Sequence, residues 1–180
     1  MQLGRGLSLL VGGARSGKSD LAVKLGEAWP GQVTFVATAT AGDDDMADRI
    51  SRHQAERPAT WTLIESPRFS AADAAALPVE DLVILDCITL LVSNLMFADM
   101  GEQAIERHIT DLAHELAART APTLVISNEV GLGIHPETPL GRAYRDTLGR
   151  ANRALAAAAE ISLFVVAGKA LPLQDLSVTW

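Results

Sequence analysis

The feature that most constrains this chain is a glycine-rich octapeptide, residues 12–19, which reads Gly-Gly-Ala-Arg-Ser-Gly-Lys-Ser. It follows an apolar run, residues 7–11, and precedes Leu21, Ala22 and Leu25 at helical spacing. This layout predicts a strand, a loop and the start of a helix. Glycines let main-chain N–H groups turn inward around an anion, and the helix N-terminus adds the positive end of its dipole. The octapeptide therefore predicts a loop that binds the phosphates of a nucleotide.

Every residue of the octapeptide is a candidate phosphate contact, and two of its side chains have distinct expected roles. Lys18 is expected to reach the β- and γ-phosphates, and the Ser19 hydroxyl to bind Mg²⁺. A second group that organises Mg²⁺ is expected at Asp86, which ends the apolar run 82–85, with a simple strand-end cap as the alternative. The candidate phosphate contacts are Gly12, Gly13, Ala14, Arg15, Ser16, Gly17, Lys18 and Ser19.

The composition limits the class of partner. The formal net charge of the 180 residues is −7, whereas a sequence-independent hold on nucleic acid needs clustered Lys and Arg. A small-molecule substrate is therefore favoured over a nucleic acid. The single cysteine, Cys87, cannot form an internal disulfide, which predicts a cytoplasmic protein. We expect no membrane span, because no run of 18 uncharged apolar residues occurs, and no secretory signal.

The order of the remaining segments predicts a single α/β domain over residues 1–180, with a mainly parallel sheet between two layers of helices. Short apolar runs alternate with longer amphipathic or alanine-rich segments, which is typical of such a sheet. The segment 168–180 is expected to be a tail. Strands are expected at 7–11, 33–37, 60–65, 82–86, 123–127 and 161–167, and helices at 18–29, 43–57, 70–77, 102–119 and 140–159.

A histidine on one expected helix is a candidate nucleophile. Met46, Ile50 and His53 fall at i, i+4 and i+7, so His53 lies on the apolar stripe of that helix. A hydrogen-bonded core histidine is the alternative. Arg49 and Arg57 lie one turn to either side, where their charges favour a neutral imidazole and their guanidinium groups can bind phosphate. A neutral imidazole can attack phosphorus and form a covalent phosphoramidate.

A second polar loop follows the expected strand 123–127. It reads Asn128-Glu129-Val130-Gly131-Leu132-Gly133. Polar residues at the carboxyl end of a parallel strand lie where ligands bind in open α/β sheets. A role in capping the loop is an equally good interpretation.

Three motifs together resemble the bifunctional adenosylcobinamide kinase and adenosylcobinamide-phosphate guanylyltransferase family of cobalamin synthesis. The motifs are residues 12–19, Arg49-Ile50-x-x-His53-x-x-x-Arg57-Pro58-x-x-Trp61, and Asn128-Glu129-Val130-Gly131-x-Gly133. The resemblance implies a P-loop NTPase fold of the RecA-like type that carries two activities. It also implies a cytoplasmic homo-oligomer, a trimer in typical members, that binds a large corrinoid.

The resemblance further implies a reaction in two steps. ATP or GTP first phosphorylates the aminopropanol hydroxyl of adenosylcobinamide. His53 then attacks the α-phosphorus of GTP, releases pyrophosphate and passes GMP to the new phosphate, which gives adenosylcobinamide-GDP. Besides residues 12–19, the positions that correspond to GTP contacts in the family are Ala37, Thr38, Ala39, Gln54, Ala55, Glu56, Arg57, Glu65 and Asp86.

Two other functions remain open from the sequence. One is a monofunctional small-molecule kinase in which His53 is structural. The other is a regulatory GTP-binding switch, which would need the guanine-reading motif Asn-Lys-x-Asp that the sequence lacks. Asp86 and Glu129 are both candidates for the general base of a kinase step.

Overall fold

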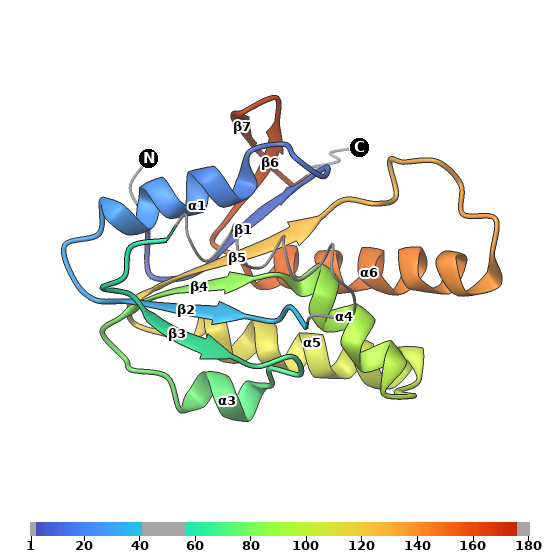
Figure 1. Cartoon of the computed structure of the whole chain (residues 1–180), viewed down its shortest axis with the longest axis horizontal. Helices are drawn as coiled ribbons and strands as arrows, with labels where there is room; N and C mark the ends of the chain where they lie inside the picture. Colours follow the sequence, from blue (N-terminus) through green and yellow to red (C-terminus); the bar gives the residue numbers. More distant parts are fainter. Residues whose placement is uncertain (1–2, 41–56, 176–180) are drawn as a thin grey trace, which may run out of the picture.

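A seven-stranded sheet flanked by helices on both faces forms the body of the protein (Figure 1). The computed structural model describes residues 3–40 and 57–175. The strands are β1 (Gly6–Gly12), β2 (Val33–Ala37), β3 (Thr62–Glu65), β4 (Leu82–Asp86), β5 (Pro122–Asn128), β6 (Ile161–Val166) and β7 (Lys169–Pro172). The described helices are α1 (Lys18–Glu27), α3 (Ala71–Ala75), α4 (Ile88–Phe97), α5 (Glu102–Ala117) and α6 (Pro139–Ala158).

The strands lie in the order β3-β2-β4-β5-β1-β6-β7, and every neighbouring pair is parallel except β6 and β7. This arrangement confirms the prediction of an α/β fold with a mainly parallel sheet. Strand β1, which leads into the octapeptide, lies between β5 and β6. Because parallel strands end at the same edge, their carboxyl ends form one rim beside the octapeptide.

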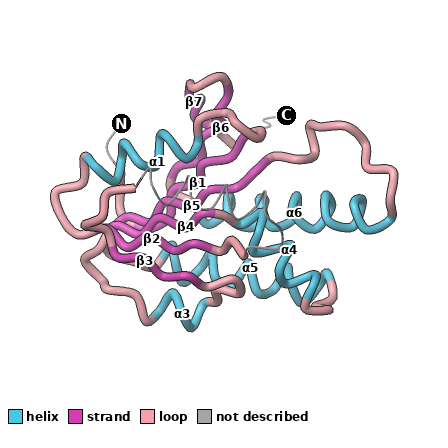
Figure 2. The backbone as a smooth tube through the Cα atoms, viewed as in Figure 1, coloured by secondary structure: helices cyan, strands magenta, loops and turns pink. Residues whose placement is uncertain are grey.

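The sheet is buried on both faces, as its continuous apolar strands predict. Within β1, Leu7 and Leu9 pack into the core beneath α3, α4, α5 and α6, whereas Leu10 packs into the core beneath α1. Figure 2 shows α1 on one side of the sheet and the other described helices on the opposite side. Each of these leucines is at most 1% exposed, and burying such a side chain contributes about 1.5–3 kcal/mol.

Two elements differ from the sequence predictions. The segment 88–97, which had no predicted structure, is helix α4, and the expected tail contains strand β7. The prediction of a tail was wrong because Ala167 and Gly168 form a two-residue turn, with φ values of 50° and 73°, that folds β7 back onto β6. The bounds of the other described elements differ from the predictions by at most two residues at either end. Most of the expected helix 43–57 lies outside the described residues.

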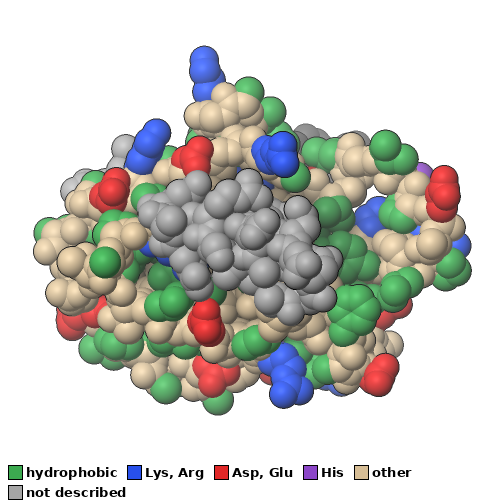
Figure 3. Space-filling view, in the orientation of Figure 1, with side chains coloured by type: hydrophobic (Ala, Val, Ile, Leu, Met, Phe, Trp, Pro, Cys, Tyr) green, Lys and Arg blue, Asp and Glu red, His purple; other side chains and the backbone are tan. Residues whose placement is uncertain are grey.

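The surface carries charges of both signs at separate positions on the face drawn in Figure 3. Across residues 3–40 and 57–175, no helix combines the length and the apolar character that crossing a membrane requires.

Candidate functional site

The predicted site residues of five strands meet along the carboxyl rim of the sheet. Strand pairing places Glu65 beside Ala37 and Ala37 beside Asp86. Strand β5 lies next to β4, and its last residue, Asn128, pairs with Gly12 at the end of β1. Adjacent strands lie about 4.8 Å apart, so β2 is about 14 Å from the octapeptide at the end of β1. This spacing matches an elongated ligand that reaches from β1 toward β2 and β3.

The octapeptide adopts the local geometry of an anion-binding loop. Arg15 and Gly17 both have a positive φ, 57° and 100°, whereas the other residues of the octapeptide have a negative φ. Alternation of this kind points successive main-chain N–H groups to the same side. Gly17 is also the N-cap of α1, and no side chain caps that helix end. The first N–H groups of α1 and the positive end of its dipole therefore face the ligand side of the loop.

Two glycines of the loop lie in close backbone contacts, and the φ of 100° at Gly17 further disfavours a side chain there. A Cβ atom on Gly12 would lie 2.2 Å from the main-chain oxygen of Val165 in β6. A Cβ atom on Gly17 would lie 3.2 Å from the Cα atom of Gly168, in the turn between β6 and β7. The Gly168 N–H also donates to the Ser16 main-chain oxygen at 2.9 Å. The β6–β7 turn therefore packs against the octapeptide at Ser16 and Gly17 and restrains its backbone.

Lys18 is folded back against the loop that contains it. Its Nζ atom donates to the main-chain oxygens of Gly13 at 2.7 Å and Gly12 at 3.1 Å, and to the Ser16 hydroxyl at 3.4 Å. The side chain is only 6% exposed. These contacts hold a positive charge at the mouth of the loop, where the phosphates of a nucleotide would be attracted to it.

Thr38 joins the end of β2 to the end of β4. Its main-chain N–H donates to the Asp86 oxygen at 3.1 Å. Its hydroxyl donates to the Cys87 oxygen at 2.7 Å and accepts from the Cys87 N–H at 2.9 Å. Thr38 is fully buried, and these three hydrogen bonds fix two predicted GTP-binding segments, residues 37–39 and Asp86, relative to each other.

The predicted Mg²⁺ site consists of Ser19, at the start of α1, and Asp86, at the end of β4. In the part of the chain that the structure describes, no three His, Cys, Asp or Glu side chains cluster as a metal site would require. This donor set fits Mg²⁺, which proteins usually hold through one or two side chains while substrate phosphates and water supply the other ligands.

The Asn128-Glu129 loop is held both to the octapeptide and to the helices behind it. The Glu129 N–H donates to the Gly12 oxygen at 3.0 Å, and the Glu129 carboxylate accepts from the Gly131 N–H at 2.8 Å. The capping role is therefore present in the structure, and Glu129 also lies next to the phosphate loop.

A buried polar network beneath this loop was not predicted from the sequence. The Asn152 side chain in α6 accepts from the Ser127 hydroxyl at 2.6 Å and donates to the Asn128 oxygen at 3.0 Å. The Asn128 N–H donates to the Thr89 hydroxyl at 3.0 Å, and the Tyr144 hydroxyl donates to the Thr89 oxygen at 3.2 Å. Burial raises the pKa of Tyr144 well above its usual value, and the nearby Cys87 thiol raises it further. The helical spacing of α6 gave no signal for Asn152, whose partners are distant in sequence.

The predicted catalytic residue His53 lies outside the described residues, together with Gln54, Ala55 and Glu56. Their roles stay predictions. Arg57 is described, and its guanidinium carbon lies 3.7 Å from the centroid of the Phe35 ring, in a cation–π contact. Arg57 is thus anchored on β2, on the face of the sheet covered by α1.

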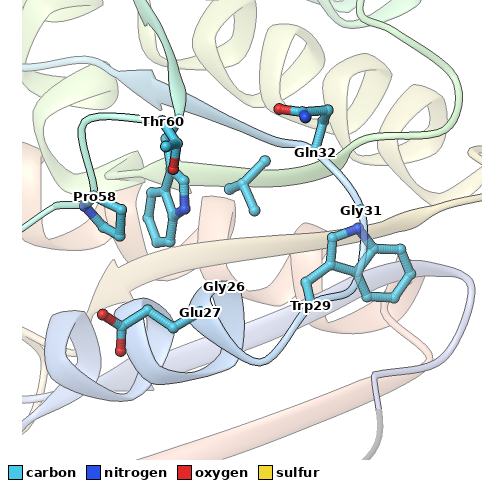
Figure 4. Close-up of a pocket in the computed structure, with 9 residues that line it drawn as sticks. Gly26, Glu27, Trp29, Gly31, Gln32, Pro58 and Thr60 are labelled. Carbon is cyan, nitrogen blue, oxygen red and sulfur yellow. The ribbon is translucent and has the colours of Figure 1, made fainter.

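A pocket of about 300 Å³ lies at the end of the sheet where the strands begin, opposite the end that carries the octapeptide (Figure 4). It is formed by the end of α1, the start of β2 and the segment that precedes β3. Its lining residues are Gly26, Glu27, Trp29, Gly31, Gln32, Val33, Pro58, Thr60 and Trp61. Because these residues surround the amino ends of the strands, this pocket is separate from the predicted phosphate site.

Comparison with known proteins identifies the family. The model of the CobU family, described as cobinamide kinase / cobinamide phosphate guanyltransferase, matches residues 8–173. The chain belongs to this family. Membership confirms the resemblance drawn from the sequence motifs, and with it the class of bifunctional kinase and guanylyltransferase.

Relatives of the CobU family match along most of their length. The bifunctional adenosylcobalamin biosynthesis protein CobU of Salmonella typhimurium is 43% identical over 173 residues, which cover 89% of this chain and 95% of that protein. The bifunctional adenosylcobalamin biosynthesis protein CobP of Pseudomonas aeruginosa is 38% identical over 167 residues, which cover 92% and 96%.

Solved structures with little sequence similarity share the fold. An ATPase of a bacterial type III secretion system matches with a TM-score of 0.56 at 10% identity, over 88% of this chain and 50% of that one. The flagellar accessory protein FlaH from Methanocaldococcus jannaschii matches with a TM-score of 0.53 at 15% identity, over 93% and 76%. These matches confirm the P-loop NTPase fold.

Proposed function

We propose that this chain phosphorylates adenosylcobinamide with ATP or GTP and then transfers GMP from GTP to adenosylcobinamide phosphate, through a guanylyl group on His53. The observation that carries the proposal is the alignment of the anion-binding octapeptide with Asp86, Ala37 and Glu65 along one rim, in a chain of the CobU family. Both activities are assigned to one domain over residues 1–180, acting in the cytoplasm as a homotrimer.

In the kinase step, the octapeptide holds the triphosphate, and Lys18 offsets the charge that develops during phosphoryl transfer. Ser19 and Asp86 would hold Mg²⁺, which would supply positive charge that neutralises the phosphates. As the aminopropanol hydroxyl oxygen bonds to the γ-phosphorus, the bond from the γ-phosphorus to the bridging oxygen breaks, which releases the nucleoside diphosphate. A carboxylate accepts the hydroxyl proton. Asp86 and Glu129 are the candidates for this role, and Glu129 lies beside the octapeptide through its main-chain bond to Gly12.

In the transfer step, a neutral His53 nitrogen forms a bond to the α-phosphorus of GTP, and the bond to the bridging oxygen of pyrophosphate breaks. The phosphate of adenosylcobinamide phosphate then attacks the same phosphorus and releases the imidazole. The histidine thereby splits one difficult transfer into two easier ones. The GTP contacts proposed for this step are residues 12–19, Ala37–Ala39, Gln54–Arg57, Glu65 and Asp86.

The test is to incubate the protein with GTP labelled at the α-phosphate, and to look for protein-bound label that acid removes. We expect label on the wild type and on His114→Asn, a control at an exposed histidine of α5, and no label on His53→Asn. His53→Asn should keep its kinase activity. Label on His53→Asn would contradict the assignment of the nucleophile. A wild type that phosphorylates the corrinoid but takes no label would be a monofunctional kinase, and one that only hydrolyses GTP would be a switch.

A further inference from the structure

Asn94 lies where three segments of the carboxyl rim come together. It extends from α4, the helix that follows β4. Its Nδ2 atom donates to the main-chain oxygens of Thr38 at 2.8 Å and Pro67 at 2.9 Å. Thr38 follows β2 and Pro67 follows β3, so one side-chain amide connects the segments that leave two adjacent strands.

The chemistry of these contacts requires an amide. Both partners of Nδ2 are carbonyl oxygens, which only accept hydrogen bonds, and the amide group supplies its two N–H donors to them. The Asn94 Oδ1 atom lies on the other side and accepts from the Thr40 hydroxyl at 3.4 Å. Aspartate has the same shape, but the carboxylate oxygen in place of Nδ2 would face two carbonyl oxygens and be repelled by them. Alanine would leave both carbonyls without this donor.

Asn94 adds a side-chain contact to a segment that backbone contacts hold on both sides. The Thr38 contacts to Asp86 and Cys87 tie the end of β2 to β4. On the β3 side, the Ser66 N–H donates to the Ala37 oxygen at 2.9 Å. The Asn94 amide is a side-chain bridge that spans both segments and anchors them to α4. Together with the Ser66 bond, it holds the backbone that follows β2 at a fixed distance from the backbone that follows Glu65.

We propose that Asn94 is a positioning residue for the nucleoside part of GTP. The inference rests on the proposed function, in which Ala37–Ala39 and Glu65 contact GTP. By strand spacing, the ends of β2 and β3 lie about 14 Å or more from the end of β1, so these segments are placed to reach the ribose and base rather than the β- and γ-phosphates. The phosphate loop is supported by contacts from Val165 and Gly168 on the other side of β1. Loss of the Asn94 amide therefore weakens binding of the nucleoside and leaves binding of the phosphates intact.

The experiment compares two ligands on the full chain. Dissociation constants for GTP and for inorganic tripolyphosphate, each with Mg²⁺, are measured by titration calorimetry for wild type, Asn94→Ala, Asn94→Asp and the control Ser93→Ala. Ser93 is the preceding residue of α4 and is similarly half-buried. We expect both Asn94 variants to bind GTP at least about tenfold more weakly, because small misplacements of positioning groups have large effects. Binding of tripolyphosphate should change less than about twofold.

Thermal unfolding of the same variants separates a positioning role from a structural one. Equal losses of GTP and tripolyphosphate binding, together with a lower melting temperature, would overturn the inference, as would unchanged GTP binding. If Asn94→Asp fails to fold, Asn94→Ala alone decides. A wild type that binds GTP no more tightly than tripolyphosphate would instead refute the proposed function, from which the inference starts.

Discussion

Gly12 and Gly13 are adjacent in the octapeptide, yet an added methyl group should have very different effects at the two positions. A Cβ atom on Gly12 would lie 2.2 Å from the main-chain oxygen of Val165, whereas a Cβ atom on Gly13 would have no atom within 4 Å. Real Cβ atoms essentially never approach closer than 3.0 Å, so Gly12→Ala must move β1 and β6 apart by about 0.8 Å. Neither glycine has a positive φ, so backbone strain does not distinguish them.

The expected cost of Gly12→Ala is that of overpacking a well-packed site, about 1–3 kcal/mol of unfolding free energy. For a chain of this size, the melting temperature should fall by about 2–12 °C. Gly13→Ala should stay within about 0.5 kcal/mol of wild type, as expected for a substitution in open space. Differential scanning calorimetry of both variants without nucleotide checks this, because nucleotide binding would add its own stabilisation. Equal melting temperatures for the two variants would refute the close approach of β6 to the loop.

Other predictions concern the helices behind the site. Asn152→Leu should lower the unfolding free energy by about 1–3 kcal/mol in urea titrations, because it leaves the buried Ser127 hydroxyl without its partner. Burial raises the pKa of Tyr144, the single tyrosine, so its phenol should stay protonated in the folded protein at pH 11, where an unfolded chain absorbs as tyrosinate. Below about pH 10 the phenol is protonated in both states, so the full stability is present. Above that pH the unfolded chain loses the proton first, and the free energy of unfolding falls by up to about 1.4 kcal/mol per pH unit. Tyr144→Phe should lack this fall. Ser70→Ala should cost about 1 kcal/mol in the same titrations, because Ser70 and Asp73 form the capping box of α3.

The sequence was sufficient for the elements whose pattern is local. The octapeptide, the buried strands and the amphipathic helix α5 each have a periodicity or spacing that points to one structure. Helix α4 was missed although its buried residues Ile88, Leu91, Val92 and Leu95 fall at i, i+3, i+4 and i+7, because further apolar residues between them make most of the helix apolar and obscure that stripe. It also follows β4 after a single residue, so no turn signal separates the strand from the helix. Strand β7 was missed for the opposite reason, since all of its residues are exposed.

The candidate site was predictable as a set of strand ends, and less so as a connected structure. Asp86 and Glu129 could be placed at the rim because each follows an apolar run. Asn94 and Asn152 could not be found, because their roles depend on partners 24 to 56 residues away in sequence. A polar residue within a helix gives no sign of which backbone oxygens it will meet.

The turn at Ala167 and Gly168 places the β6–β7 hairpin in direct contact with the octapeptide. Gly168 contacts the octapeptide directly, so any force or deletion that displaces β7 is transmitted to the Ser16 backbone. Tags fused after β7, or chains shortened before it, should therefore alter phosphate affinity while every residue of the octapeptide stays the same. Expression designs should therefore keep the β6–β7 hairpin intact, because it supports the backbone of the predicted phosphate loop.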